Sequence, residues 1–511
     1  MKKVKLNAKA SVCLVLSAAG MMLLGSCAEG YEAPNGFDAG VKNTQIETPE
    51  ADSLTFKVST DGKTATISWP TVMGADGAEV TFLNVDDPEN PVVVDGYDKK
   101  IVDGSKFTVS VTEDSRYQMT MRTLGNHKLG NTDATEEKVY NFSTMIPAVA
   151  VIPSGSDIYE FMQNLQLDTV STERAIELEA HGEYTLSGQV DFGPHNLTLR
   201  GNKVHRPTVR ILNGGSFATY CGLKVKYINF DMTEASSSGS FLFMSKDNLP
   251  DSIKAGQRPG YSGSKLSKNN YMVEEPIYIA HCWFKNLPGS IFHDNSVKCC
   301  FWYFTLTDCI VQLNREKGTQ AFISFEKAGE SIKNITLEKS TIYNIHDCDA
   351  YFIRFFNNSQ SQPVKAYGDA SSLYKSHRLT LSHTTFSKTF TTKNFTNNIN
   401  PNDYFVSVDH CIFNQVAQCY RMQANGGRTF RFNFWFGGSH PRDLNEKDSS
   451  GTPFAMEYDP QFQGDITQEL DLTLPNGGIN FTPGEYEIVA NNGGDPRWLP
   501  NGGGDDEETE E

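Results

Sequence analysis

A regular alternation of apolar and polar positions runs between residues 197 and 437. Each copy reads apolar, any residue, apolar, two polar-leaning positions, a small residue, any residue, apolar, and the copies begin at Leu197, Leu223, Ile277, Phe304, Ile335, Leu379, Val406 and Phe430. A period of two indicates β-strands. One copy cannot bury its apolar side alone, so stacked copies must supply the core. The pattern therefore predicts an all-β parallel β-helix.

The sixth template position holds small residues in successive copies: Ile228, Cys282, Cys309, Ser340, Thr384 and Cys411. If the copies are in register, these side chains form a ladder inside the helix. Ser and Thr alternate with Cys at this position and no CxxC pair occurs, so we expect packing thiols and not a metal or redox site. His281, His383 and His410 come one position earlier and are expected to be turn residues.

A second class of strand precedes several copies. Assigning alternate residues to the interior by hydrophobicity places Phe241, Phe243, Ile291, Ile323, Phe325, Tyr351, Ile353, Tyr420 and Met422 inside. The opposite set then lies outside on one sheet: Leu242, Met244, Lys246, Phe292, Asp294, Phe322, Ser324, Glu326, Phe352, Arg354, Phe356, Arg421, Gln423 and Asn425. A slip of one residue would invert every assignment.

This outward set predicts a glycan-binding groove centred on Phe352, Arg354 and Phe356. The further members of the predicted groove are Lys246, Arg421 and Gln423. Exposed aromatic rings suit the faces of sugar rings, and Arg binds carboxylates through two N–H groups. The insertions 246–276 and 357–378 follow these strands directly. They either wall the groove or simply cover an apolar strip.

The N-terminus carries a targeting signal. Four lysines within the first nine residues precede a short apolar run that ends in LLGSC. A run this short indicates a secretory signal and not a mature membrane span. LLGSC resembles the bacterial lipobox, which implies a signal peptide over 1–26 and lipidation of Cys27 as an outer-membrane anchor. Glu29 and Glu32 resemble surface-export signals, so we expect exposure at the cell surface.

Net charge argues against nucleic acid as a partner. The chain carries a net charge of −17, and loss of residues 1–26 removes four lysines and no acidic residue, which gives −21. A chain this acidic is a poor ligand for the phosphate backbone.

Composition changes along the chain predict its domains. Residues 27–50 are polar, with Pro and Gly, and are expected to form a tether. Residues 51–146 show short alternating segments separated by turns, which predicts a β-sandwich. Trp69 and Tyr117 resemble the core Trp and Tyr of fibronectin type III domains. The β-helix is expected over 147–500, followed by an acidic tail over 501–511.

A short helix is predicted where the β-helix begins. Ile158, Phe161, Met162 and Leu165 recur at helical spacing, and Asp157 with Glu160 resembles a capping box. Such a helix would cover the open edge of the first coil. An opening helix followed by a Gly-x-Tyr turn resembles the pectate-lyase-like right-handed parallel β-helix superfamily.

The whole arrangement resembles a narrower group of proteins. These are surface lipoproteins of gut Gram-negative bacteria, with a fibronectin-type-III-like domain before the β-helix and a Gly-Asp-Pro-Arg-Trp ending, here Gly494 to Trp498. They are domains of unknown function encoded near polysaccharide-uptake systems. The resemblance implies a polysaccharide ligand and a glycan-uptake transporter complex as partner.

The chemistry leaves a binder and an enzyme as alternatives. A lyase on this fold needs carboxylates for Ca²⁺ and a basic residue to take a proton, and Asp294, Glu326 and Arg354 are the candidates. VSVDHC (406–411) resembles a pectate-lyase stretch, but Ser407 replaces its Trp. HRPTVR (205–210) resembles the lyases' Arg-x-Pro-x-x-Arg only loosely. Because the carboxylates are scattered singly, we favour capture of a plant-type, pectic polysaccharide, with a Ca²⁺-assisted polysaccharide lyase as the alternative.

Overall fold

The computed structural model describes residues 41–168, 172–259, 261, 267–315, 320–326, 331–355, 378–397, 405–419, 428–438, 447–448 and 450–503. The chain divides into two compact units. One comprises residues up to Val85 together with Pro91–Thr144, and the other comprises Asp86–Asn90 and the chain from Met145 onward. Cys27, Phe356, Arg421 and Gln423 lie outside the described residues. No helix among the described residues is long and apolar enough to cross a membrane.

The first unit consists of two antiparallel sheets. One sheet has the order β1 (Thr55–Val58), β2 (Thr64–Ser68), β6 (Lys106–Ser110). The other has the order β4 (Val92–Val93), β3 (Ala75–Asn84), β7 (Arg116–Gly125), β8 (Lys138–Ser143), with β5 (Lys100–Val102) also on β3. The 3-10 helices are η1 (Ala51–Ser53) and η2 (His127–Leu129). Trp69 and Tyr117 are buried in the core of this unit, which confirms their predicted place.

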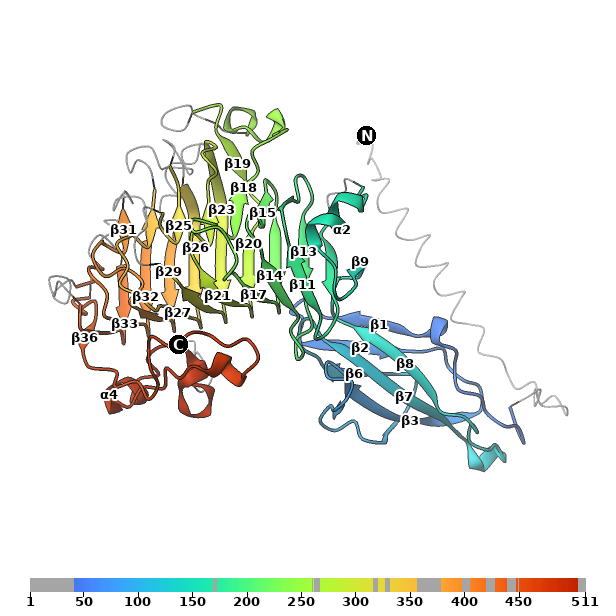
Figure 1. The fold of residues 1–511 in the computed structure, drawn as a ribbon. Helices are drawn as coiled ribbons and strands as arrows, with labels where there is room; N and C mark the ends of the chain where they lie inside the picture. Colours follow the sequence, from blue (N-terminus) through green and yellow to red (C-terminus); the bar gives the residue numbers. More distant parts are fainter. Residues whose placement is uncertain are drawn as a thin grey trace, which may run out of the picture. The chain divides into compact units, whose positions relative to one another are not determined.

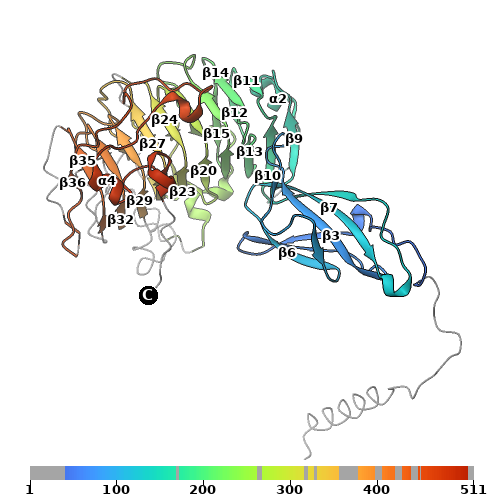
Figure 2. The ribbon, with the colours of Figure 1, turned by 90° about the horizontal axis from the view of Figure 1, so that it is seen from below.

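The second unit is a parallel β-helix whose coils contribute to three long sheets (Figures 1 and 2). The 11-stranded sheet runs β34 (Arg428–Arg431), β32 (Phe405–Asp409), β29 (Arg378–Ser382), β26 (Ser331–Glu338), β23 (Cys299–Thr307), β20 (Ile277–Ala280), β16 (Leu223–Lys226), β13 (Leu197–Arg200), β10 (Arg174–Leu178), β9 (Ala148–Ile152), with β19 (Tyr271–Val273) on β23. These strands carry the repeated template.

The other two sheets complete each coil. The 10-stranded sheet runs β11 (Glu183–Leu186), β14 (Thr208–Ile211), β17 (Asn229–Asp231), β21 (Trp283–Leu287), β24 (Ile310–Leu313), β27 (Thr341–Asn344), β30 (Thr385–Ser387), β33 (Ile412–Asn414), β35 (Phe434–Phe436), β36 (Met456–Glu457). The 7-stranded sheet runs β12 (Gln189–Asp191), β15 (Ser216–Thr219), β18 (Leu242–Met244), β22 (Phe292–His293), β25 (Ile323–Ser324), β28 (Ile353–Arg354), β31 (Thr396–Asn397). The predicted fold class is confirmed.

The predicted ladder lies inside the helix. All six residues at the sixth template position are completely or almost completely buried. The Cys282 and Cys309 thiols each donate a hydrogen bond to the carbonyl two residues earlier, as the Ser340 and Thr384 hydroxyls do. Burial raises the pKa of Cys282 to about 12 and that of Cys309 well above its usual range. The thiols are therefore packing groups, as expected.

The preceding template position is a sharp corner. His281, His383 and His410 have φ values of 55°, 45° and 50°, which is the left-handed region used at tight turns. Their identity as turn residues is confirmed. One repeat boundary was wrong, because Val406 pairs with Arg428 and not with Phe430. The two-residue offset keeps the same alternation, so Phe430 still points inward.

The entry helix is present as α2 (Ile158–Asn164). The Asp157 side chain accepts a hydrogen bond from the Glu160 amide at 3.1 Å and caps the helix. The same carboxylate accepts from the Thr185 hydroxyl on β11 at 2.7 Å. Ile158 is buried, and Phe161, Met162 and Leu165 pack against the β-helix core. The apolar face predicted from the sequence thus covers the first coils.

The insertion at 246–276 folds as a small extension. It contains η3 (Asp251–Ile253), η4 (Ala255–Gln257) and β19, which pairs with the first half of β23. Ala255 and Met272 pack with Cys300 in a small buried cluster. This insertion therefore enlarges the 11-stranded sheet.

The last part of the chain covers the outside of the 10-stranded sheet (Figure 1). It contains η7 (Pro475–Gly478), α4 (Tyr486–Ala490), η8 (Pro496–Trp498) and η9 (Pro500–Gly503). Leu470, Ile479 and Phe481 pack on Ile310 and Tyr343. Further along the sheet, Ile488 packs on Ile412 and Phe434.

The Gly-Asp-Pro-Arg-Trp motif forms a buried polar network, here called the Arg497 network: His281, Asp308, Thr341, Asp495, Arg497 and Trp498. Arg497 donates to Asp495 at 2.9 Å and also to Asp308. The Thr341 hydroxyl donates to Asp495 and accepts from the Trp498 indole, and Asp308 pairs with His281 at 2.5 Å. The motif fastens three coils with hydrogen-bonded ion pairs.

Candidate functional site

The 7-stranded sheet presents a row of paired residues on its outer side, here called the outer rung: Ala218, Phe243, His293, Ser324, Arg354 and Asn397. The register joins these residues across consecutive coils. Strands in a sheet lie about 4.8 Å apart, so neighbouring side chains in the rung are within reach of one ligand. Phe243, Arg354 and Asn397 are half-buried, whereas His293 and Ser324 are buried.

The outer rung contains only part of the groove that the sequence predicts. Arg354 lies on the outer side as expected. Phe352 does not: it is 1% exposed and stacks in the core on Phe322 and Phe395. Lys246 is exposed, but it follows the end of β18 by two residues and is not in the rung.

The error has a physical cause at the corner before each strand. Two consecutive apolar residues enter the core there, as in the pairs Phe241–Leu242, Ile291–Phe292, Phe322–Ile323 and Phe352–Ile353. The first member lies at the bend and the second begins the strand. Alternation counted from the first member inverts the strand, which placed Phe243 inside and Phe292 outside. Alternation counted from the second member, as for Ile323 and Ile353, is correct within the strand but places the first member outside, which is the error at Phe352.

His293 is held by contacts on three sides. Its ring packs edge-on against Phe243 at 5.5 Å between centroids. The amide of Asn295 donates to Nδ1 at 2.9 Å, so in the neutral ring the proton is on Nε2. Nε2 is buried and has no hydrogen-bond partner, although Oε1 of Glu326 lies 3.5 Å away. His293 thus offers an N–H without an acceptor.

Asp294 is structural and not a ligand residue. It is completely buried, and its two oxygens accept from the amides of Ser296 at 3.0 Å and Glu326 at 2.6 Å. These bonds tie the turn after β22 to the end of β25. Ca²⁺ requires six to eight oxygen ligands. With Asp294 committed to backbone amides, Glu326 is the one carboxylate here with an exposed side chain, so the predicted Ca²⁺ role for this pair is not supported.

A transition metal does not fit this cluster or the other His/Asp cluster among the described residues. At His293 the nitrogen nearest Glu326 carries the proton and has no lone pair for a metal. The second cluster combines His383, Asp409 and His410. Its imidazoles stack in parallel, 4.6 Å apart and inclined by 12°, so their in-plane lone pairs do not converge. Both oxygens of Asp409 already accept from Arg431, at 3.0 and 3.2 Å.

The outer rung also lacks the geometry of a Ser–His–acid nucleophile. Such a ring accepts the serine proton on one nitrogen and donates from the other to the carboxylate. Nδ1 of His293 is taken by Asn295 and Nε2 faces Glu326. No ring nitrogen remains to accept a proton from Ser324, whose buried hydroxyl also has no hydrogen-bond partner. The rung is therefore equipped to bind polar groups and not to activate a nucleophile.

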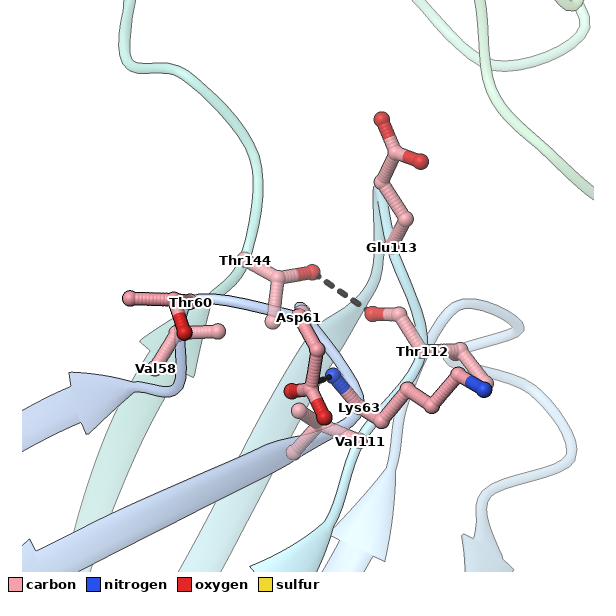
Figure 3. A pocket seen from close by; sticks show the side chains of 9 residues that line it. Val58, Thr60, Asp61, Lys63, Val111, Thr112, Glu113 and Thr144 are labelled. Carbon is pink, nitrogen blue, oxygen red and sulfur yellow. Dashed lines mark hydrogen bonds between the residues drawn. The ribbon is translucent and has the colours of Figure 1, made fainter.

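The first unit has a hollow at one end of its sheets, with a volume of about 500 Å³ (Figure 3). Its lining includes Asp61, Lys63, Thr112 and Thr144. Asp61 accepts from the Ser59 hydroxyl and the Lys63 amide, and Thr144 donates to the Thr112 carbonyl at 2.8 Å. These polar groups satisfy one another within the turns, so the hollow offers little to a ligand.

Comparisons with known proteins match parts of the chain to two families, and neither family description names an activity. Residues 1–184 match a family described as a domain of unknown function, DUF4992, and residues 182–345 match a second such family, DUF4957. No curated protein matches the chain.

Two solved structures resemble the chain weakly. Pectate lyase PelI from Erwinia chrysanthemi, in complex with tetragalacturonic acid, is 9% identical, with 58% of this chain and 85% of that chain covered and a TM-score of 0.13. A family 28 exopolygalacturonase from Yersinia enterocolitica is 8% identical over 75% of this chain and 74% of its own, also with a TM-score of 0.13. Scores this low carry no argument about function.

Proposed function

We propose that this protein binds a polysaccharide on the outer rung and does not cleave it. The observation that carries the proposal is the buried Nε2–H of His293, which has no acceptor and lies 3.5 Å from the Glu326 carboxylate. A buried donor without a partner costs about 1–3 kcal/mol. A sugar hydroxyl accepts and donates at once, so one hydroxyl could accept from Nε2 and donate to Glu326.

The neighbours of His293 extend the same chemistry along the row. Ser324 adds a hydroxyl without a partner on the next coil, Arg354 adds a guanidinium on the coil after that, and Phe243 adds a half-buried ring on the preceding coil. A ligand with hydroxyls at regular intervals would contact successive coils. An extended polysaccharide, including a pectic one, meets this requirement.

The test is affinity electrophoresis of the purified protein in gels that contain plant polysaccharides, pectic and neutral. At least one polysaccharide should retard the protein, and His293→Ala and Glu326→Gln should abolish the retardation. Thr380→Ala, a small change on the outer side of the 11-stranded sheet, is the control and should behave as the parent protein. Retardation that survives in both rung variants would refute the site.

The same preparations should be tested for release of unsaturated products by ultraviolet absorbance. We expect none, because among the described residues of the outer rung no group is arranged to hold Ca²⁺ or to take a proton. Product release that depends on Ca²⁺ and on Arg354 would replace the proposal with the polysaccharide lyase.

We further propose that the protein is an outer-membrane lipoprotein, anchored through Cys27, that presents the β-helix at the cell surface and works with a glycan-uptake transporter complex. The LLGSC sequence supports the anchor. A Cys27→Ala protein should appear in the soluble fraction, whereas the parent should be in the outer membrane and accessible to protease on intact cells. Membrane retention of Cys27→Ala would contradict the anchor.

A further inference from the structure

A second set of polar groups without partners lies on the 10-stranded sheet, away from the outer rung. Three buried atoms there have no hydrogen-bond partner: Nε of Arg206, Oδ1 of Asn229 and Nε1 of Trp283. Asn229 and Trp283 are direct neighbours in the register of β17 and β21, and Arg206 precedes β14, the strand beside β17. The three residues therefore come from three adjacent coils.

Arg206 stacks on Trp283. The guanidinium carbon lies 4.8 Å from the centroid of the indole ring, which is within the range of a cation–π contact. This contact fixes the plane of the guanidinium without using its N–H groups. An arginine held in this way presents its donors to a ligand with little further loss of conformational freedom.

Asp308, a carboxylate whose charge acts on Arg206, already has partners of its own. It pairs with His281 and accepts a hydrogen bond from Arg497, and Asp495 in turn accepts from Arg497 and Thr341. None of the ion pairs among the described residues includes Arg206. Burial lowers the pKa of Arg206, and the nearby positive charge of Arg497 lowers it further, while Cys282 and Asp308 act in the opposite direction. Its charge therefore has no hydrogen-bonded counter-ion.

We infer that Arg206, Asn229 and Trp283 form a binding site for an oxyanion. A carboxylate or a sulfate group supplies the acceptors that the Arg206 and Trp283 N–H groups lack, and it neutralises the guanidinium. Asn229 lies beside Trp283 in the register and can contribute through its side-chain nitrogen, which donates, whereas its Oδ1 is an acceptor and has to face away from the anion. The site is on a different sheet from the outer rung and does not depend on the proposed function.

The chain offers a matched control for this site. Arg210 lies on β14, four residues after Arg206, and its half-exposed side chain is 3.7 Å from Glu234. Arg206→Gln and Arg210→Gln change the net charge equally and on neighbouring parts of one surface. A difference between the two variants therefore reports the specific site and not the general field.

The experiment is titration of the full-length protein with sodium sulfate and, separately, with sodium acetate, followed by tryptophan fluorescence. Sodium chloride keeps the ionic strength constant, because sulfate also stabilises folded proteins non-specifically. We expect saturable binding of at least one anion to the parent and to Arg210→Gln. The affinity of Arg206→Gln for the same anion should be lower by at least about tenfold. The two anions distinguish a sulfate from a carboxylate preference.

Trp283→Phe keeps a ring under the guanidinium and removes the indole N–H. Calorimetry, which does not depend on the indole signal, should show weaker but measurable binding to this variant. Unchanged thermal unfolding in chloride alone would show that all variants are folded. The inference is overturned if no anion binds saturably, or if Arg206→Gln binds as tightly as Arg210→Gln. His293→Ala should bind anions normally, so failure here and failure of the polysaccharide proposal are separate results.

Discussion

The outer rung and the Arg497 network contain similar types of residue, but these side chains serve opposite purposes in the two regions. In the Arg497 network the charged and polar side chains bind one another, with Asp495 accepting from both Thr341 and Arg497. In the outer rung Nε2 of His293 and the hydroxyl of Ser324 are buried and have no hydrogen-bond partner. A buried polar group costs stability unless it is paired. On this β-helix the Arg497 network and the proposed binding site therefore differ in whether their buried polar groups have hydrogen-bond partners.

The largest expected effect is at Arg497. Arg497→Ala would leave Asp495 buried and Asp308 partly exposed without their shared cation, and leaving a buried charge such as Asp495 without its partner costs about 3–5 kcal/mol. Urea unfolding should show this loss in the free energy of unfolding. Polysaccharide binding by the folded protein should be unchanged. A loss of unfolding free energy below about 1 kcal/mol would show that the Arg497 network contributes little to the stability of the fold.

Phe352→Ala tests the layer directly beneath the outer rung. Phe352 packs on Phe322, Phe386 and Phe395, so its removal leaves a cavity and should cost about 3–5 kcal/mol. The measurement is chemical denaturation, with Lys246→Ala as the exposed control. If Phe352→Ala were as stable as the parent but failed to bind polysaccharide, Phe352 would belong to the groove, as the sequence predicts, and not to the core.

The sequence was sufficient for the stacking of coils and insufficient for the site, for one physical reason. The long alternation of the template strands fixes which of their side chains point inward. The two-residue error in the register at Phe430 therefore did not change which side chains are buried. The strands of the 7-stranded sheet are two to four residues long. Alternation in so short a strand depends on where it starts, and the bend that buries both Phe352 and Ile353 is not visible in composition.

Some of the site was still within reach of the sequence. Arg354, Ser324 and Glu326 were assigned to the outer side, and the structure places Arg354 and Ser324 in the outer rung, with Glu326 beside His293. His293 was missed because it falls between two residues counted as outward. The repeated pair of adjacent large apolar residues was the signal that could have revealed the bend. The missing partner of Nε2 depends on the turn at Asn295, which no spacing rule predicts.

A smaller effect should appear in the pH dependence of stability. Burial raises the pKa of Asp495 to about 6, although Arg497 and Thr341 oppose the rise. A carboxyl that holds its proton more tightly when folded contributes stability that is fully present below its unfolded pKa, about 3.8, and is lost as pH rises through about 6. The difference in unfolding free energy between parent and Asp495→Asn should shift by about 3 kcal/mol between pH 4 and pH 8, in favour of the Asn variant at pH 8. A constant difference across this range would contradict the raised pKa.

The smallest effect on stability is expected at His293. His293→Ala removes a buried donor that has no partner, but it also removes the acceptor of the Asn295 amide, so its cost should be about 1–2 kcal/mol, below that of Arg497→Ala, while polysaccharide retardation is lost. Thermal unfolding and affinity electrophoresis on the same sample would test both parts. A loss of stability as large as that of Arg497→Ala would show that His293 stabilises the fold as the Arg497 network does. The contrast between a stabilising network and a binding row would then be lost.

The path of the final segment has a consequence for the order of folding during synthesis. Coils of a β-helix contact only their neighbours, so they can assemble one after another as the chain emerges from the ribosome. The motif at Gly494 to Trp498 is made after all the coils, yet it bonds backwards to His410, Thr385, Thr341 and Asp308. Until the segment from Leu470 onward is made, the outside of the 10-stranded sheet keeps an apolar surface that includes Ile310, Phe434 and Tyr343. We therefore expect a nascent chain stopped just short of Leu470 to be a nearly complete β-helix that chaperones still bind.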